Sequence, residues 1–167
     1  MDLQVIDNFL EDYQFKSLQT ILMGDVFPWY YNEGILTEDH SSYDSNQFQF
    51  THTFYDKRPP WNGISSSAYD IMEYVLSKLR VRELYKIKAN LNPKTIFHRT
   101  GGYHIDDKNM TTAVFYINTC NGYTKFKEGS KVKSVANRMV IFDSNLEHQG
   151  VTCTDEKRRV VINFNYE

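Results

Sequence analysis

The most constraining feature of this sequence is a two-residue alternation of apolar and polar side chains that begins near Leu84 and continues to the C-terminal end. In the segment KIKANL the apolar residues are separated by lysine and asparagine. Similar short segments are TTAVFYIN, GYTKF, VKSV, NRMVIF and RRVVINFNY, with Gly, Asn and charged residues between them. Since successive side chains of a β-strand point to opposite faces, the pattern predicts a series of short strands.

Two helices are expected before this strand-rich half. Asp7 or Asn8 can cap a helix that ends near Met23. Ser67 and Asp70 have the spacing of a capping box ahead of a second apolar stripe. The stripe of the first helix comprises Leu10, Tyr13, Leu18, Ile21 and Leu22, and that of the second comprises Ile71, Met72, Val75, Leu76 and Leu79.

The remaining residues of the first half predict two strands, LQVI at 3–6 and QFQFTHTFYD at 47–56. Several short strands that follow two helices are typical of a sandwich in which the helices cover one sheet. We therefore predict a mainly β (α+β) fold, a double-stranded β-helix (jelly roll) flanked by N-terminal helices on one sheet. The expected organisation is a single domain over 1–167, with helical and irregular support in 1–83 and the jelly-roll core in 84–167.

Composition narrows the function classes. The chain has 167 residues, of which 41% are hydrophobic and 24% charged, so it has the make-up of a globular domain. A net charge of −2 argues against strong attraction to nucleic acid or to an anionic membrane. No apolar run approaches the roughly 20 residues that span a bilayer. Cys120 and Cys153 lack metal-site or disulfide-framework spacing, which predicts free thiols and a cytoplasmic location.

The residues best suited to chemistry are His104, Asp106 and His148. In extended chain His104 and Asp106 point to the same side, and His148 can supply a second imidazole. Two imidazoles and one carboxylate form a ligand face that leaves coordination positions open, as in non-haem Fe(II) oxygenases, although Mn(II), Co(II), Ni(II) and Zn(II) accept the same ligands. Asp107 is a rival ligand that the spacing disfavours, and polar residues at strand ends remain the simple alternative.

The second half resembles a known family through an ordered series of motifs: HID, VFYIN, NGYTKF, NRMVIF, EHQG and RVVINFN. Over residues 84–166 it is similar to the Fe(II)/2-oxoglutarate-dependent oxygenase superfamily, and within it to prolyl-4-hydroxylase-like members, including small ones from bacteria and phages. The N-terminal VIDNFLEDYQ also resembles the opening of such proteins. The resemblance implies Fe(II) held by His104, Asp106 and His148, with 2-oxoglutarate as cosubstrate and O2 as oxidant.

The resemblance also implies a basic residue, on the strand after the distal histidine, that pairs with the far carboxylate of 2-oxoglutarate. Arg158 and Arg159 both qualify, and the phrase R-x-x-I-x-F favours Arg159, with Arg158 facing outward. A guanidinium can make two parallel bonds to a carboxylate. Tyr116 matches a family tyrosine whose hydroxyl bonds the same carboxylate, with a core aromatic as the alternative.

Three further polar residues, Asn90, Thr124 and Asn163, are at expected inward positions and are candidates for contact with the cosubstrate. Bonds from these side chains to neighbouring backbone are the alternative. Many family members have a tyrosine on the strand before the HxD motif. That strand here reads KANLNPKT, so the contact is either missing or replaced by Asn90. Among the other histidines, none is expected to bind the metal.

The implied activity is hydroxylation of a C–H bond, coupled to the conversion of 2-oxoglutarate to succinate and CO2. Peptidyl-proline is the leading expectation for the substrate, with a small molecule as the alternative. The segments expected near it are Trp29–Tyr31, the polar loop 39–47 and Trp61, which equally suit a cover for the jelly roll. Two other readings are a non-catalytic jelly-roll binding module and a Zn-dependent hydrolase, neither of which needs a carboxylate anchor.

Overall fold

The computed structural model describes residues 3–33, 47–106 and 108–167. The predictions for loop residues 39–46 and for Asp107 therefore lie outside the described residues. Within the described ranges, no helix combines the length and the apolar character needed to cross a bilayer.

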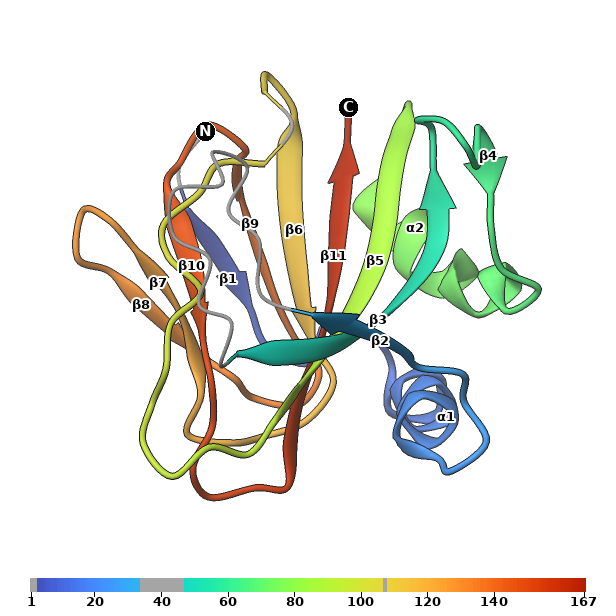
Figure 1. Ribbon diagram of the computed structural model, residues 1–167. Helices are drawn as coiled ribbons and strands as arrows, with labels where there is room; N and C mark the ends of the chain where they lie inside the picture. Colours follow the sequence, from blue (N-terminus) through green and yellow to red (C-terminus); the bar gives the residue numbers. More distant parts are fainter. Residues whose placement is uncertain (1–2, 34–46, 107) are drawn as a thin grey trace.

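Two antiparallel sheets form the body of the molecule (Figure 1). The major sheet has the order β1-β9-β6-β11-β5-β3-β2, with β4 paired to β3, and the minor sheet has the order β10-β7-β8. The strands of the major sheet are β1 (Gln4–Ile6), β2 (Tyr30–Glu33), β3 (Phe48–Asp56), β4 (Gly63–Ile64), β5 (Leu84–Pro93), β6 (Thr111–Tyr116), β9 (Arg138–Asp143) and β11 (Arg158–Tyr166). Those of the minor sheet are β7 (Tyr123–Phe126), β8 (Lys131–Lys133) and β10 (His148–Val151). The predicted jelly-roll class is confirmed.

One face of the major sheet is apolar and carries the helices α1 (Asp12–Met23), η1 (Tyr69–Met72) and α2 (Glu73–Leu79) (Figure 1). Ile87, Phe115 and Ile162 are fully buried on this face. They come from three neighbouring strands and pack with Leu22 of α1 and Val75 of α2. Most of the buried apolar residues belong to this layer. Burying each side chain of this size contributes about 1.5–3 kcal/mol to stability.

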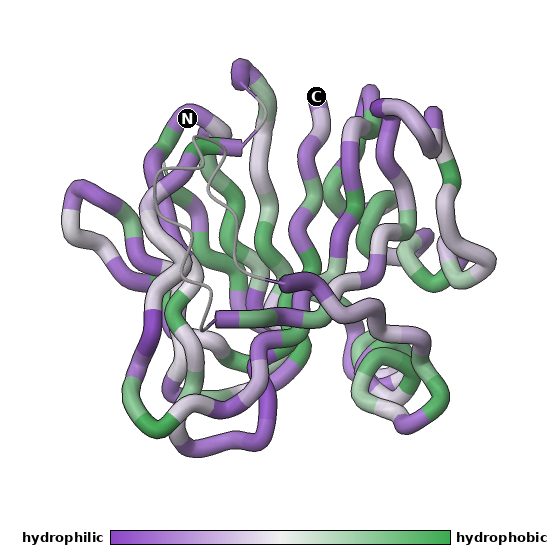
Figure 2. Tube along the Cα trace, in the orientation of Figure 1, coloured by the Kyte–Doolittle hydropathy of each residue, from purple (hydrophilic) through white to green (hydrophobic). Residues whose placement is uncertain are grey.

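The opposite face of the major sheet meets the minor sheet, and only part of it is apolar. Tyr116, Phe126 and Phe142 pack between the two sheets. Along β11, by contrast, the residues that alternate with the core positions include Arg159 and Asn163. Figure 2 shows the resulting mixture of hydrophobic and hydrophilic segments along the strands. Buried polar side chains are costly unless they form hydrogen bonds or ion pairs, so a polar stretch between the two sheets indicates a candidate binding site.

The first helix begins later than predicted. Asn8 has a left-handed backbone (φ 50°) and the chain there is pinned to Asn137, whose Oδ1 accepts a bond from the Leu10 backbone N–H at 2.8 Å. Helix α1 starts at Asp12, where Glu11 and Gln14 form the capping box. The expected caps Asp7 and Asn8 are therefore wrong, because contacts with the strand layer hold these residues out of the helix.

The apolar stripe of α1 also differs from the prediction. Phe15, Leu18 and Leu22 are its buried residues, whereas Tyr13 is 68% exposed and Ile21 is largely exposed. The predicted face was wrong because it assumed a helix that starts near Asn8, whereas α1 begins at Asp12.

The second helical segment has two parts, the 3₁₀ turn η1 and the short α2, and its first turn lacks the expected capping box. The N-cap of η1 is Ala68, with no side-chain cap bond, and Ser66 forms a turn just before it, since its Oγ accepts a bond from the Ala68 N–H at 3.0 Å. The segment ends at Arg80, which adopts a left-handed conformation.

The predicted strands near residues 3–6 and 47–56 are confirmed as β1 and β3. They lie toward opposite edges of the major sheet. The first half of the chain therefore contributes strands to the sheet as well as helices. Strands β2, β4 and β10 were not predicted. In particular, His148 was expected in a turn and is instead the first residue of β10.

Candidate metal centre and cosubstrate pocket

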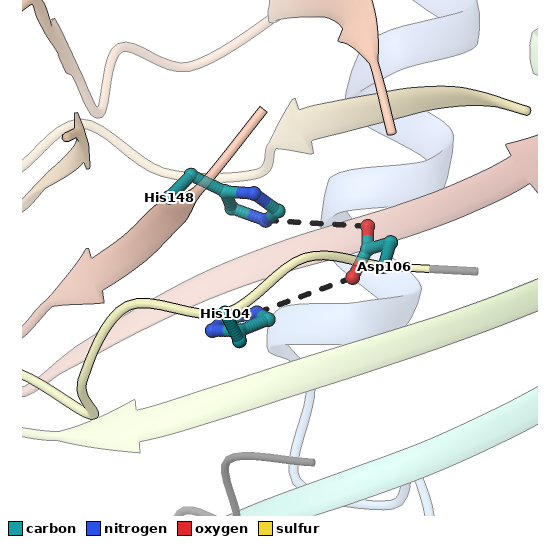
Figure 3. A group of neighbouring side chains, drawn as sticks. All are labelled: His104, Asp106 and His148. Atoms are coloured by element: carbon teal, nitrogen blue, oxygen red, sulfur yellow. Dashed lines mark ion pairs between the residues drawn. The ribbon is translucent and has the colours of Figure 1, made fainter. Parts of the chain in front are cut away.

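His148 converges on His104 and Asp106 although it is far from them along the chain (Figure 3). His104 and His148 face each other in an isolated antiparallel bridge, closed by backbone N–H to O bonds of 3.0 and 2.9 Å. Nε2 of His104 lies 4.0 Å from Oδ1 of Asp106, and Nε2 of His148 lies 4.0 Å from Oδ2. All three ligand atoms lie within 4.8 Å of one another, so a single cation can contact each of them.

Both imidazole rings are oriented by backbone carbonyls. Nδ1 of His148 lies 2.9 Å from the carbonyl oxygen of Leu146, and Nδ1 of His104 lies 3.3 Å from that of Gly102. A carbonyl only accepts, so in each neutral ring the proton is on Nδ1 and the lone pair is on Nε2. This is the arrangement by which metal-ligating histidines are normally held.

The carboxylate of Asp106 is held by two donors on the floor of the site. Its Oδ2 accepts bonds from Oγ1 of Thr112 at 2.9 Å and from Nδ2 of Asn165 at 3.0 Å. The same Asn165 amide also donates to Oγ1 of Thr112 at 3.1 Å. Oδ1 has no such partner among the described residues, which leaves it available to a metal ion.

The protonation states of these groups suit metal binding. Burial raises the pKa of Asp106, but His148, His104 and the bonds from Asn165 and Thr112 outweigh it, so the pKa is below its usual value. Burial lowers the pKa of His148. A charged carboxylate and a neutral imidazole are the forms in which these side chains bind a metal.

Arg159 is the other unusual group of the inner face. It is 3% exposed, donates from Nε to Oγ of Ser134 at 2.8 Å and from Nη2 to Oγ1 of Thr124 at 3.3 Å. Its guanidinium lies 5.6 Å from the ring centre of Tyr116. No carboxylate of the described residues lies within ion-pair distance of it, so burial lowers the pKa of Arg159 without a full counter-charge.

Two glycines make room for this arginine. A Cβ at Gly122 would lie 2.7 Å from Cδ of Arg159 and 2.9 Å from the carbonyl oxygen of Val151. A Cβ at Gly150 would lie 3.6 Å from Nη1, an ordinary contact. Gly122 therefore allows the arginine side chain to pass directly over the backbone of the minor sheet.

A cavity of about 220 Å³ joins the two groups, with the His–Asp–His cluster on one side and Arg159 on the other. The predicted cosubstrate residues Asn90, Thr124 and Asn163 all line it. Oδ1 of Asn163 is buried without a hydrogen-bond partner among the described residues, which is the state expected of a group that meets a ligand. Their contact with a cosubstrate stays a prediction.

Tyr116 is fully buried behind this lining. Its hydroxyl donates to Oγ1 of Thr124 at 2.8 Å, and burial raises its pKa. Thr124, which lines the cavity, thus stands between the tyrosine hydroxyl and the cavity space. The geometry gives Tyr116 a part in positioning Thr124 and Arg159, while its predicted direct bond to the cosubstrate stays a prediction.

Comparison with known proteins gives structural neighbours and no sequence relative. The sequence matches no protein-family model and no curated protein. Among solved structures, a prolyl hydroxylase from Trichoplax adhaerens, in complex with a hypoxia inducible factor oxygen degradation domain peptide fragment, has a TM-score of 0.66 at 15% identity, covering 98% of this chain and 82% of that one. A Pseudomonas putida prolyl-4-hydroxylase has a TM-score of 0.60 at 13% identity, covering 99% and 92%. A 2OG-Fe(II) oxygenase family oxidoreductase from Burkholderia pseudomallei has a TM-score of 0.66 at 7% identity, covering 99% and 84%.

The chain has the 2OG-Fe(II) oxygenase fold. The likeness confirms the resemblance found in the motifs, at the level of the fold. Identities of 15% and below carry no further information about substrate, so the chemistry of the site must be argued from the side chains themselves.

Several residues of this oxygenase-fold site were missed from the sequence. Thr112 and Asn165 hold the Asp106 carboxylate, and Ser134 holds Arg159. For Asn165 a signal existed, because it shares the alternation of Arg159 and Asn163 along RRVVINFNY. The roles of Thr112 and Ser134 could not be predicted from the sequence, because they depend on how distant strands pair.

The other residues singled out in the sequence lie off the cavity. Arg158 is on the helix-covered face and donates to the backbone carbonyl of Met23, so it is not the solvated charge that was expected. His52 is buried, with its ring nitrogens 2.7 Å from the carbonyl of Pro28 and 2.7 Å from Oγ of Ser66, which is a structural role. His98 lies 2.7 Å from the carbonyl of Thr152 through Nδ1.

The aromatic residues expected near the substrate are also not part of the cavity lining. Tyr30, Tyr31 and Trp61 are more than half exposed, and Trp29 packs edge-on against Phe27 at 5.2 Å between ring centres. Their contact with a substrate stays a prediction.

Both cysteines are buried free thiols. With Asp155 they form a second group of possible ligand atoms within 4.8 Å of one another. However, the carboxylate of Asp155 accepts the Asn121 backbone N–H at 3.0 Å through each oxygen, and burial raises the pKa of Cys153 to about 11. The Asp155 carboxylate is thus already engaged by the backbone of Asn121, and we assign no metal to this group.

Proposed function

We propose that residues 1–167 form a single-domain Fe(II)- and 2-oxoglutarate-dependent dioxygenase that hydroxylates a C–H bond of its substrate and releases succinate and CO2. One observation carries the proposal. A single cavity joins a His–Asp–His cluster to the buried guanidinium of Arg159, which lacks a carboxylate partner in the described part of the chain. The fold found by structural comparison supports it.

The donor set fits ferrous iron. His104 and His148 present Nε2, and Asp106 presents Oδ1, with the remaining polar atoms of all three tied to the protein. Two imidazoles and one carboxylate leave other coordination positions for cosubstrate and oxygen. When bound, Fe(II) with 2-oxoglutarate and O2 supplies the oxidation of the C–H bond. The protein contributes binding, orientation and the exclusion of competing reactions.

The cosubstrate is a dicarboxylate, and the site has a place for each end. The carboxylate beside the keto group would lie at the metal, and the far carboxylate would meet Arg159 through two parallel N–H bonds. Such a bond supplies the counter-charge that the buried guanidinium lacks. Thr124 and Asn163 line the same cavity, and contact between these two side chains and the cosubstrate is part of the proposal.

For the substrate we propose a prolyl residue of a peptide, with a small molecule as the alternative. Support comes from the resemblance in the motifs, and two structural neighbours are named prolyl hydroxylases. The buried free thiols agree with a reducing compartment, and the cytoplasm is the proposed location.

A binding module or a Zn-dependent hydrolase accounts less well for this arrangement. Neither has a use for a buried arginine at the end of the metal cavity, and burying a cation without a partner is costly. The retained charge therefore favours a function that delivers an anion to it.

The activity is tested by succinate release. The protein reconstituted with Fe(II) is incubated with 2-oxoglutarate, with and without O2, and with peptides that contain proline. We expect O2-dependent succinate, raised by a true substrate. Product formation that continues without O2 would indicate the hydrolase, and an Fe(II)-loaded protein that neither binds 2-oxoglutarate nor forms succinate would indicate the binding module.

A further inference from the structure

Two lysines on β5 face the same cavity as the metal ligands and have no role in the proposed function. Lys86 and Lys88 both line the cavity and are partly buried. They alternate with Ile87 and Ala89, which are buried in the core on the other face of the sheet. The alternation of the strand therefore directs both ammonium groups inward.

Strand register places the two lysines beside the reaction centre. Lys86 pairs with Asn165, which holds the metal carboxylate, and Lys88 pairs with Asn163. Neighbouring strands lie about 4.8 Å apart, so the lysines are one strand away from the floor of the metal site. Arg159 lies further along β11, opposite Asn92. The lysines therefore lie toward the metal end of β11 and away from Arg159.

Asp56, the β3 residue that pairs with Lys86 in register, already has a cationic partner in Arg58. The carboxylate of Asp56 accepts bonds from Nε and Nη2 of Arg58, both at 3.0 Å, and its charge is matched there. Neither lysine forms a hydrogen bond or ion pair with a described residue. Burial, Lys86 and Arg58 lower the pKa of Lys88 to about 8, against the opposing effect of Asp56. An anion bound beside Lys88 would favour the charged form of the lysine and raise its pKa.

The sum of the charges in the cavity also favours an anionic ligand. Its lining has three basic side chains, Lys86, Lys88 and Arg159, which count as cations at pH 7, and one carboxylate, Asp106. Fe(II) adds two positive charges and 2-oxoglutarate adds two negative ones. The loaded cavity therefore retains an excess of two positive charges, equal to the two lysines.

We infer that the substrate carries an anionic oxygen group, a carboxylate or a phosphate, which Lys86 and Lys88 bind beside the C–H bond to be oxidised. The inference rests on the proposed function, since it assumes that the metal and Arg159 hold the cosubstrate. In a prolyl substrate the anion is either the carboxylate of a free amino acid or the side chain of an acidic neighbour in a peptide.

Anion binding can be measured without knowing the substrate. The protein is loaded with Zn(II) and 2-oxoglutarate, labelled with ¹³C at lysine Cε, and titrated with inorganic phosphate while the Lys88 resonance is followed. We expect a saturable shift whose apparent Kd for phosphate rises about tenfold or more in Lys88→Gln and in Lys86→Gln, where the resonance of the lysine that remains is followed. The variant Lys133→Gln, which removes an exposed lysine of β8, is the control and should behave as wild type. A shift that does not saturate, or that is equal in all variants, overturns the inference.

Matched substrate pairs then distinguish the source of the anion. Succinate release is compared for L-proline and L-prolinamide, and for proline peptides with glutamate or glutamine next to the proline. Activity confined to the free acid indicates a small molecule, and activity confined to the glutamate peptide indicates an acidic peptide. A neutral member as active as its acidic partner contradicts the inference. If no pair is active, the phosphate titration decides. Failure to bind Zn(II) or 2-oxoglutarate at all would instead count against the proposed function.

Discussion

Replacing Arg159 with methionine should abolish tight 2-oxoglutarate binding while leaving the fold intact. The guanidinium is buried, and Ser134 and Thr124 orient it toward the cavity. Removing one partner of a buried charge pair costs about 3–5 kcal/mol. At 1.4 kcal/mol per factor of ten, this corresponds to a Kd for 2-oxoglutarate raised by roughly 10²–10³-fold.

The matched control is Arg158→Met. This arginine is on the other face of β11, and among the described residues its side chain donates only to the Met23 carbonyl at the end of α1. Its loss should cost about 1 kcal/mol of stability and change the Kd for 2-oxoglutarate less than about twofold. The two variants remove the same charge from adjacent residues, so overall electrostatics cannot explain a difference between them.

Binding is measured by anaerobic titration of the Fe(II) protein with 2-oxoglutarate, and folding by thermal unfolding of the ligand-free protein. Because Arg159 has no carboxylate partner without ligand, methionine should leave the unfolding free energy within about 1 kcal/mol of wild type. Saturating 2-oxoglutarate at 100 times Kd stabilises wild type by about 2.7 kcal/mol, and the variant should lose that gain. Equal Kd values for the two variants, or a larger effect of Arg158→Met, would refute the assigned strand face.

Three other substitutions test single contacts. Gly122→Ala puts a methyl group against the Arg159 side chain, so it should cost about 1–3 kcal/mol of stability and weaken 2-oxoglutarate binding. The control Gly150→Ala, where the added methyl group has ordinary spacing, should have neither effect. Thermal unfolding measures the stability, and titration with 2-oxoglutarate measures the binding. Asn137→Ala removes both buried bonds to the chain entering α1 and should lower stability by about 2–4 kcal/mol in urea unfolding; a loss below about 0.5 kcal/mol would contradict that clamp. Asn165→Leu removes a donor to the metal carboxylate and should weaken Fe(II) affinity about 10–100-fold in a competition assay with a chelator; unchanged affinity would show that this bond is dispensable.

The strand core was predictable because burial on one face imposes a period of two on the sequence. That period also separated Arg158 from Arg159, since a one-residue shift reverses every side chain. The segment Tyr30–Glu33 escaped because it is a short, mostly exposed edge strand without alternation. His148 was assigned to a turn because HQGV has no strand-forming composition, and its pairing with β7 decides its conformation.

The convergence of His104, Asp106 and His148 was predictable from residue type, spacing and the ordered motifs, and the contacts around them were not. Asn165 and Thr112 meet because they are paired in register on β11 and β6, and register between distant strands has no local sequence signal. The start of α1 failed for a similar reason, since Asn137 pins the chain from more than a hundred residues away. Lys86 and Lys88 were visible as an alternating pair, but only the fold shows that their face is the cavity.

The central claim is that His104, Asp106 and His148 hold one ferrous ion to which 2-oxoglutarate binds. Anaerobic addition of Fe(II) and 2-oxoglutarate should produce a visible metal-to-ligand charge-transfer band in wild type, because the keto acid chelates the iron. The band should be absent in His104→Ala and in Asp106→Ala at the same protein concentration. A band of wild-type intensity in either variant, or no band in folded wild-type protein at saturating Fe(II) and 2-oxoglutarate, would contradict the account.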